Sequence, residues 1–470
     1  MRKLPIAVAL VALALAPVRA QGPQPDWAKT EPEILQHFQA LVKMDTADPP
    51  GGEKPAVDYL KQVLEQAGIP VQIFALEPNR PNLVARLKGN GKKRPILIMG
   101  HTDTVNIDPK KWVDHGPFSA DRAGGFVYGR GTVDDKDNAT AGLMVMLMLK
   151  RLAVPLDRDV IFLAEAGEEG TTRVGIGTMA EQHFDAIDAE YCLAEGGNVT
   201  RIGGEVKFSS IQTLEKIPRA VELVAHGVAG HGSVPLRTNP VARLSTAVGK
   251  VAAWKPPIRI NETTGAYFKR LASISTPEQA ERYKAILSPD PKVNDRADEW
   301  FLDNEPRHAS MIRTSVSPNI ITGGYRVNVI PSEATATLDV RLHPDDDPAK
   351  FLASLKAVVN DPNIEVKWAA RDVRPGGTSR LTTDAFKVIE AETTKHYNTI
   401  TLPTMSTGAT DMAYLRAKGV QCYGIGPAMD VEDGPKGYGA HSDQERIIES
   451  ELYRFVRFHY DVVADLARAR

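Results

Sequence analysis

Three short runs of this chain are apolar at every position, and they restrict its fold more than any other feature. They are Ile96–Met99, Val160–Ala164 and Tyr191–Ala194. Strands that are apolar throughout are typical of a sheet covered on both faces. Helical patterns accompany them, at Pro55–Gln66 and Ala139–Leu152. Strands that alternate with helices predict an α/β layer fold, here with a mixed sheet.

The pattern changes near Ile217 and changes back after Pro375. Between these points the segments follow the order β-α-β-β-α-β, which is the ferredoxin-like pattern. They are Val221–Ala225, Pro240–Trp254, Asn319–Tyr325, Ala334–Leu342, Asp347–Val359 and Ile364–Trp368. We therefore predict that an α/β domain, formed by residues 21–216 and 376–470, is interrupted by a smaller α+β domain at residues 217–375.

A polar, proline-bearing stretch at residues 256–312 separates the first helix of the smaller domain from its second strand. We interpret it as an insertion with some helix of its own. Two roles stay open for it: it could shape a substrate pocket, or it could obstruct contact between two such domains.

The first twenty residues have the pattern of a signal peptide. A short positive region precedes the apolar run Ile6–Ala16, and Val18 and Ala20 provide small residues before Gln21. The run is shorter than the roughly 20 apolar residues that span a membrane. We therefore predict a secreted or periplasmic protein without a stable membrane anchor.

The charge balance argues against a nucleic-acid partner. The chain has 57 lysine and arginine residues and 59 aspartate and glutamate residues, a formal charge of −2. Proteins that bind nucleic acids usually carry a basic excess or patch. Cys192 and Cys422 are the only cysteines, which allows one disulfide and argues against cysteine ligands for a metal.

Acidic and histidine side chains gather where the predicted strands end or in glycine-rich loops. They are His101, Asp103, Asp134, Glu168, Glu169, Glu195 and His441. The carboxyl ends of strands in an open α/β sheet converge on one crevice. Several acids in one crevice would repel each other without a cation. Imidazole and carboxylate without thiolate suit zinc, with manganese or cobalt as substitutes.

Taken together, these motifs resemble the M20 metallopeptidases, a family of carboxypeptidases, aminoacylases, dipeptidases and deacylases. The likeness covers nearly the whole chain after residue 20. Three features are similar to the carboxypeptidase S and N-acyl-amino-acid hydrolase branch. They are Thr132–Asn138, the run from Asn319 through Asn328 to Arg341, and the long insertion. The resemblance implies a zinc-peptidase catalytic domain interrupted by a ferredoxin-like lid.

The resemblance also implies a ligand set for two zinc ions. His101 and Glu195 would hold one ion, Glu169 and His441 the other, and Asp134 would bridge them, preceding a cis peptide bond to Asp135. Some relatives in this branch have Asp-Glu-Gly-Gly where this chain has Ala194 to Gly197. The acid that this chain offers there is Glu195.

A catalytic sequence follows from the same resemblance. A hydroxide between the metals would attack the amide, with Glu168 as the general base. Asp103 would orient the ring of His101.

The lid supplies further residues in the family. His231 resembles a lid histidine that stabilises the developing oxyanion and, in dimeric relatives, reaches into the partner's site. Asn328 and Arg341 resemble residues that contact the substrate, and an arginine fork suits a terminal carboxylate. The loop Thr407–Asp411 resembles a family loop near the site, whose role is either substrate contact or structural.

Three substrate classes remain open: a short peptide that loses its C-terminal residue, an N-acyl amino acid, and a dipeptide. The lid and the branch likeness favour the first two. A zinc-bound binding protein without activity is the alternative from another class, and the presence of Glu168 argues against it. A homodimer through the lid is compatible with an enzyme of any of these three substrate classes.

Overall fold

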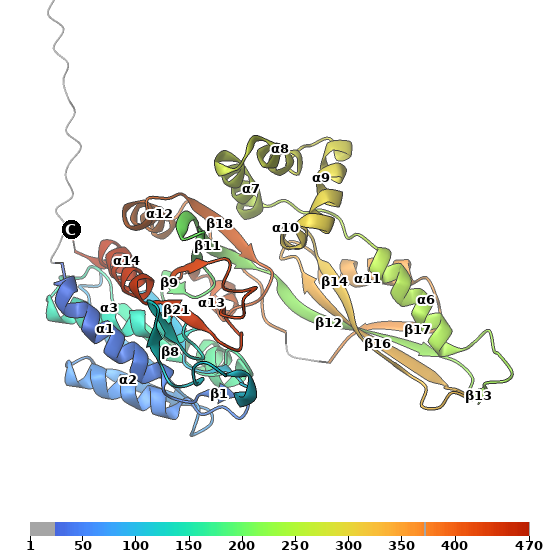
Figure 1. The fold of residues 1–470 in the computed structure, drawn as a ribbon, viewed down its shortest axis with the longest axis horizontal. Helices are drawn as coiled ribbons and strands as arrows, with labels where there is room; N and C mark the ends of the chain where they lie inside the picture. Colours follow the sequence, from blue (N-terminus) through green and yellow to red (C-terminus); the bar gives the residue numbers. More distant parts are fainter. Residues whose placement is uncertain (1–23, 371–372, 470) are drawn as a thin grey trace, which may run out of the picture.

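The computed structural model describes residues 24–370 and 373–469, so the predicted signal segment lies outside the described residues. The described strands form a ten-stranded mixed sheet, a four-stranded antiparallel sheet and three smaller sheets. Figure 1 shows the two large sheets in two bodies, with the smaller body extending sideways from the larger.

Segments from both ends of the chain build the large sheet. Its order is β2-β3-β8-β4-β9-β19-β11-β10-β20, with β18 paired to β11. The strands are β2 (Val71–Ala75), β3 (Pro81–Leu87), β4 (Ile96–His101), β8 (Val160–Glu165), β9 (Tyr191–Ala194), β10 (Asn198–Ile202), β11 (Glu205–Glu215), β18 (Thr401–Ser406), β19 (Gln421–Gly424) and β20 (Ala428–Asp430). β4 runs parallel to β8 and β9, whereas β3 runs antiparallel to β8. The mixed sheet expected from the sequence is confirmed.

Helices cover both faces of the large sheet, which explains why its central strands are apolar throughout. Ile96 and Ile98 of β4 belong to the core on one face, and Leu97 and Met99 belong to the core on the other. Successive side chains of a strand point to opposite faces, so a strand covered twice needs apolar residues at each position. The first face is covered by α1 (Trp27–Val42), α2 (Lys54–Gln66), α3 (Lys136–Arg151), α12 (Asp384–Tyr397) and α14 (Glu449–Ala467), and the second by α4 (Thr178–Gln182), α5 (Phe184–Ile187) and α13 (Met412–Ala417).

Helix α3 packs unusually close to the sheet. Its residues from Lys136 to Leu149 are all buried. A Cβ atom at Gly142 would lie 2.4 Å from the ring of Phe162, and one at Gly100 would lie 2.8 Å from the backbone nitrogen of Ala139. These glycines let the start of α3, which follows Asp134, approach the end of β4, which carries His101.

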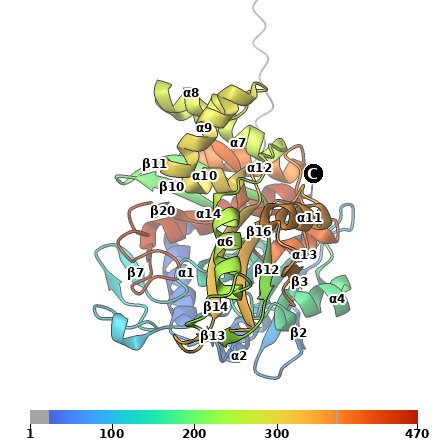
Figure 2. The same ribbon diagram turned by 90° about the vertical axis from the view of Figure 1, so that its right-hand side faces the viewer.

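The smaller body is the ferredoxin-like lid. Its sheet has the order β14-β16-β12-β17, and α6 and α11 pack on one face of it. The elements are β12 (Ile217–His226), α6 (Pro240–Ala253), β14 (Ser315–Gly323), β16 (Glu333–Leu342), α11 (Pro348–Val359) and β17 (Ile364–Trp368). Buried residues alternate with partly exposed ones along β16, as expected for a sheet with one covered face. Figure 2 looks onto this domain from its free end.

The insertion packs on the catalytic sheet, although it lies within the sequence of the lid. It forms α7 (Glu262–Ile274), α8 (Pro277–Ala285), α9 (Pro291–Asn304) and α10 (Pro306–Met311). Its core, with Phe268 and Phe301 at the centre, continues into Leu214 of β11 and into Leu402 and Met405 of β18. Figure 1 shows α7 above β11 and β18.

The remaining elements are short. They are β1 (Ala47–Asp48), β5 (Thr104–Val105), η1 (Pro109–Lys111), β6 (Arg122–Ala123), β7 (Phe126–Tyr128), η2 (Arg173–Gly177), β13 (Gly230–His231), β15 (Val329–Ile330) and β21 (Arg446–Ile448). Cys192 and Cys422 occupy paired positions on β9 and β19, and both are free and buried, so the described chain has no disulfide between them. Across residues 24–370 and 373–469, no helix has the length and apolarity to cross a membrane.

Candidate metal centre

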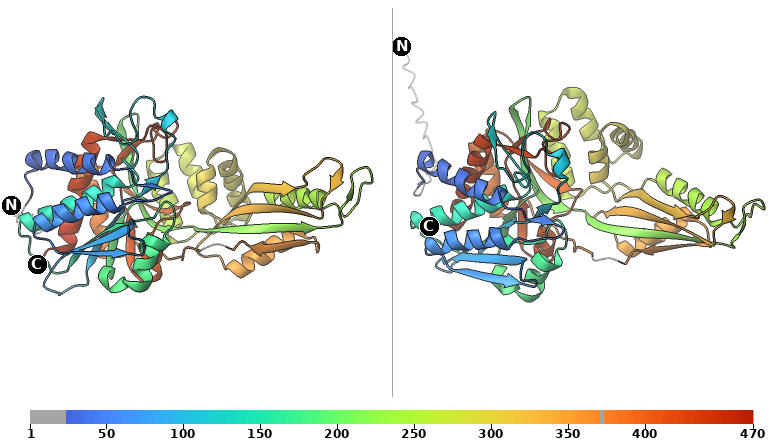
Figure 3. Two further views of the ribbon diagram at one scale, coloured as in Figure 1. Left: turned by 90° about the horizontal axis from the view of Figure 1, so that it is seen from below. Right: turned by 60° about the horizontal axis from the view of Figure 1, so that its bottom comes forward.

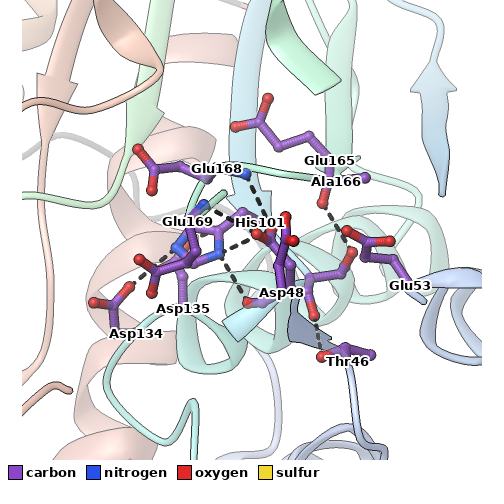
Figure 4. A network of polar contacts seen from close by, with 12 residues as sticks. Thr46, Asp48, Glu53, His101, Asp134, Asp135, Glu165, Ala166, Glu168 and Glu169 are labelled. Atoms are coloured by element: carbon purple, nitrogen blue, oxygen red, sulfur yellow. Dashed lines mark hydrogen bonds and ion pairs between the residues drawn. The ribbon is translucent and has the colours of Figure 1, made fainter. Parts of the chain in front are cut away.

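Three parallel strands bring the predicted ligands to one edge of the large sheet. His101 is the last residue of β4, Glu168 and Glu169 follow β8, and Glu195 directly follows β9. β4 pairs in parallel with both neighbours, so the carboxyl ends of the three strands lie together. Figure 4 shows His101, Glu168 and Glu169 at this edge, beside Asp134.

Asp134 lies between two groups of candidate ligands. His101 Nε2 is 3.0 Å from Asp134 Oδ1, and His441 Nε2 is 3.0 Å from Asp134 Oδ2. His441 Nε2 is also 3.0 Å from Glu169 Oε1. Ligand atoms lie within 4.8 Å of one another in each of two groups, His101–Asp134–Glu195 and Asp134–Glu169–His441. One carboxylate is therefore shared by two groups of candidate ligands, with His101 at one oxygen and His441 at the other.

The loops that carry Asp134 and His441 are tied together by Glu445. Glu445 Oε2 accepts a hydrogen bond from Arg130 Nη1 at 2.7 Å, and its Oε1 accepts one from Val133 N at 2.9 Å. Both Arg130 and Glu445 are buried. The peptide bond between Asp134 and Asp135 is cis, and His441 has a φ of 61°, a left-handed conformation that is rare outside glycine.

Asp103 holds the loop that follows β8. Its Oδ1 accepts a hydrogen bond from Glu168 N at 3.2 Å, and its Oδ2 accepts one from Glu169 N at 3.0 Å. His101 Nδ1 lies 3.0 Å from the carbonyl oxygen of Asp103 and 3.5 Å from its Oδ1. The same residue thus fixes the backbone of both glutamates and leaves Nε2 of His101 facing Asp134.

The negative charge of the buried acids in this centre favours the binding of a cation. Burial, together with repulsion from Glu168 and Asp134, raises the pKa of the Glu195 carboxyl well above its usual range. Hydrogen bonds to Asp134 and Glu169 raise the pKa of His441 to about 10. A buried group of acids is unfavourable unless positive charge compensates it. The nitrogen and oxygen donors, with no sulfur among them, fit zinc and related divalent ions.

Arg374, which no sequence motif marks, contacts Glu168. Arg374 Nη1 donates to Glu168 Oε1 at 2.8 Å, and its Nη2 donates to the Glu168 carbonyl oxygen at 3.0 Å. Arg374 Nη1 also lies 3.3 Å from Asp411 Oδ1. Burial raises the pKa of Glu168, and the positive charge of Arg374 opposes that rise. Arg374 lies in a segment without periodicity, so no sequence pattern marked it.

The loop Thr407–Asp411 is anchored by buried side chains. Glu215 accepts hydrogen bonds from Thr410 N at 2.8 Å and from Thr410 Oγ1 at 2.7 Å. Arg416 Nη1 donates to the same carboxylate at 2.9 Å. In this structure the loop contributes Asp411, which is buried beside Arg374.

The structure does not bring the lid residues to the centre. His231 lies in β13, at the end of the lid farthest from the large sheet, and its Nδ1 is 2.7 Å from Ser233 Oγ. Asn328 is beside it, since its carbonyl oxygen accepts from Gly232 N at 2.8 Å. Arg341 lies at the other end of the lid sheet, paired with Pro218, and its Nε is 3.1 Å from Asp339 Oδ1. In both views of Figure 3 the lid extends away from the larger body.

Two further groups of acids in the described chain already have a cationic partner. Asp48 and Glu53, next to Asp103, bind the guanidinium of Arg80 at 2.6 Å each. The group Glu392–His396–Asp461 surrounds Lys395, whose Nζ is 2.7 Å from Asp461 Oδ2. These groups are ion-pair networks, which leaves the cluster around Asp134 as the candidate metal centre.

A doubly covered α/β sheet with histidines and carboxylates at its strand ends, joined to a ferredoxin-like lid, defines a class of metal-dependent hydrolases. The chain belongs within that class to peptidase family M20/M25/M40, whose model matches residues 97–465. Members of this family depend on metal ions and cleave amide or peptide bonds, so the protein is a hydrolase of this kind.

Named relatives agree with this assignment. The chain is 25% identical over 396 residues to the probable carboxypeptidase S-like 2 of Dictyostelium discoideum, covering 81% of this chain and 74% of the relative. It is 25% identical over 401 residues to the human N-fatty-acyl-amino acid synthase/hydrolase PM20D1, covering 83% and 76%. Among solved structures, the M20 metallo-carboxypeptidase Sso-CP2 of Sulfolobus solfataricus has a TM-score of 0.68 at 20% identity, covering 94% of this chain and 99% of that one.

Proposed function

We propose that the protein uses two zinc ions to hydrolyse an amide bond whose amine belongs to an amino acid with a free carboxylate. The substrate is then an N-acyl amino acid or the C-terminal end of a short peptide. The observation that carries this proposal is the position of Asp134, with one oxygen towards His101 and the other towards His441.

The ligands divide into two sets around that carboxylate. His101 and Glu195 would complete one site, and Glu169 and His441 would complete the other, with Asp134 common to both. When bound, the two cations would supply a Lewis acid for the carbonyl and a water whose pKa is lowered to roughly 7.

The residues of the chain supply the remaining chemistry. Glu168 takes a proton from the attacking water and delivers it to the leaving amine. Adjacent Glu168 and Glu169 can differ in role because Asp103 binds both backbone amides and Arg374 draws only the Glu168 carboxylate to itself. Zinc as the native ion is supported by the donor set alone.

The lid provides the groups that recognise the substrate. Arg341 is at the hinge end of the lid, where a guanidinium fork could take the substrate carboxylate. His231 and Asn328 are at the far end of the lid, at and beside β13, away from the large sheet. This supports a homodimer in which His231 of one subunit stabilises the oxyanion in the site of the other.

The relatives support the substrate class. One is named as carboxypeptidase S-like and another as an N-fatty-acyl-amino acid synthase/hydrolase. We also propose export of the protein, on the signal-peptide pattern of residues 1–20.

The test is an assay of amine release by the zinc-loaded chain, with N-acyl amino acids, blocked and free dipeptides, and short peptides. Glu168→Gln is the matched variant, because it keeps the size of the side chain and removes the base. We expect wild-type release from substrates with a free carboxylate, and a loss of about 10²- to 10⁴-fold in kcat in the variant.

Metal content is measured on the same samples. Glu168→Gln should keep its zinc, because Glu168 is outside both ligand sets. Full activity in Glu168→Gln, or activity that survives complete removal of metal, would contradict the mechanism. Release only from dipeptides with a free amino group would favour a dipeptidase.

A further inference from the structure

The insertion forms one wall of a mainly apolar cavity against the catalytic sheet. The cavity has a volume of about 460 Å³, within the range of small-molecule sites. Its apolar walls are Phe208 of β11, Tyr267 and Leu271 of α7, Tyr283 of α8, Met311 and Met405. We call it the insertion pocket.

A second cavity lies beside the insertion pocket and beside two loops of the metal centre. It has a volume of about 190 Å³, and Val133 and Ala440 in its wall are the chain neighbours of Asp134 and His441. Asn198 and Val431 line both cavities. Asn198 begins β10, three residues after Glu195. The smaller cavity therefore borders both the insertion pocket and the loops that carry Asp134 and His441.

Four polar residues of the insertion pocket are bound to one another in two pairs. Tyr283 donates to Glu305 Oε1 at 3.1 Å, and the hydroxyl of Tyr267 lies 2.9 Å from His308 Nε2. The remaining charged residue in the wall, Arg307, is exposed and lies on the solvent side. The other polar residues of the wall, Asn198, Thr200, Ser210 and Thr404, carry no charge. The interior thus suits an uncharged group, because a buried carboxylate is unfavourable without a cation beside it.

We propose that the insertion pocket holds the apolar acyl chain of an N-acyl amino acid substrate. This inference rests on the proposed amidohydrolase function and adds which group of the substrate the enzyme selects. The carbonyl end of the chain lies at the metal centre, and the chain passes Asn198 and Val431 into the pocket. Because the insertion packs on the catalytic sheet, the pocket keeps its shape when the lid moves.

Selection by chain length follows from this placement. Each methylene moved from water into an apolar pocket increases affinity by up to about fourfold. We expect kcat/KM for one amino acid to rise about two- to fourfold per methylene from N-acetyl to longer acyl chains, and to level off once the pocket is filled.

Ser210→Trp tests the placement by filling the pocket. Ser210 lines the pocket from β11, and Ser273→Trp on the exposed side of α7 is the matched control. The substrates are N-acetyl, N-octanoyl and N-dodecanoyl derivatives of the same amino acid. Ser210→Trp should lower kcat/KM for the dodecanoyl substrate by at least about tenfold and leave the acetyl substrate within about twofold. Ser273→Trp should change neither.

Thr404→Phe reduces the volume of the pocket from β18. It serves as a second test of the placement if Ser210→Trp does not fold. Acetyl activity at the wild-type level shows that each variant is folded. The inference is overturned if short and long acyl chains react equally in the wild type, or if both Ser210→Trp and Thr404→Phe slow all three substrates alike. It is also overturned if the variants alter preference for the amino-acid side chain and not for the acyl chain. Failure of the proposed function looks different, because then no N-acyl amino acid of any length is cleaved.

Discussion

Arg374 donates a hydrogen bond to the carboxylate of Glu168 over 2.8 Å, and a second one to its carbonyl oxygen over 3.0 Å. The two residues are 206 positions apart in the sequence. Arg374 belongs to the segment that returns from the lid, so the side chain proposed as the base is held by the link between the two domains.

Arg374→Met should therefore lower kcat and leave KM almost unchanged. A hydrogen bond to a charged group contributes about 1.5–3 kcal/mol, which corresponds to a loss of about 10- to 100-fold. Arg374→Lys should recover part of the lost kcat. Steady-state kinetics check this, with Arg380→Met as the control, because Arg380 is an exposed arginine of the same segment. An equal loss in both methionine variants would contradict the assignment.

The two ligand sets predict how metal content changes. Wild type should bind about two zinc ions per chain, His441→Ala and Glu195→Ala about one each, and Asp134→Ala less than one, because Asp134 is shared. Elemental analysis after dialysis measures this. His396→Ala should bind as much metal as wild type, because the acids around His396 already pair with Lys395. Loss of one ion in that variant would place a metal site elsewhere.

The position of His231 predicts complementation between subunits. His231→Ala and Glu168→Gln should each be nearly inactive. Mixed dimers contain one site with both native residues, so equal mixing after dissociation and reassembly should restore about a quarter of wild-type activity. Light scattering establishes the dimer. If the mixture stays as inactive as its components while mixed dimers form, His231 serves the site of its own chain.

His459 predicts a specific loss of stability in acid. Burial lowers the pKa of His459 to about 3, and neither ring nitrogen has a hydrogen-bond partner among the described residues. In the unfolded chain the pKa is about 6.5. The unfolded state therefore binds the extra proton between these values, and stability falls as the pH decreases below about 6.5. His459 should lower the free energy of unfolding by about 2 kcal/mol when the pH decreases from 7 to 5.

Urea unfolding of wild type and His459→Leu at both pH values measures this contribution. The leucine variant should lose about 2 kcal/mol less than wild type on acidification, because it has no proton to bind. The same loss in both proteins would show that His459 does not titrate as described.

The N-terminal pattern predicts processing. When the chain is exported by a bacterial host, mass spectrometry of the purified protein should find Gln21 as the first residue. Ala20→Arg should block cleavage, because the host peptidase that removes signal peptides requires a small residue at this position. An intact N-terminus on the exported wild-type protein would contradict the signal-peptide interpretation.

The sequence predicts best those features that repeat along the chain. Tyr191–Ala194 is a strand with the bounds expected, and the candidate ligands after the apolar strands meet because parallel strands end at one edge. β11 was not predicted, although Val206 and Phe208 alternate with exposed polar residues at its start. β18 was not predicted because it carries a proline that argues against a strand.

Contacts between distant segments could not be predicted. The link between Glu445 and Arg130 and that between Arg374 and Glu168 join separate parts of the chain, and neither has a local signal. The insertion was recognised as helical, but the surface on which it packs depends on where β11 and β18 lie.

The packing of the insertion also changes how the lid is attached. The chain passes between the two bodies at Lys216, between α6 and α7, between α10 and β14, and after β17. Lys216 Nζ donates to Ser310 and Ser315 at 3.1 Å each, which joins two of these passages. Two attachments would leave the lid free to swivel, whereas several side by side suppress twisting. The lid should therefore rotate about a single axis, which changes its distance from the metal centre without twisting the lid about its own long axis.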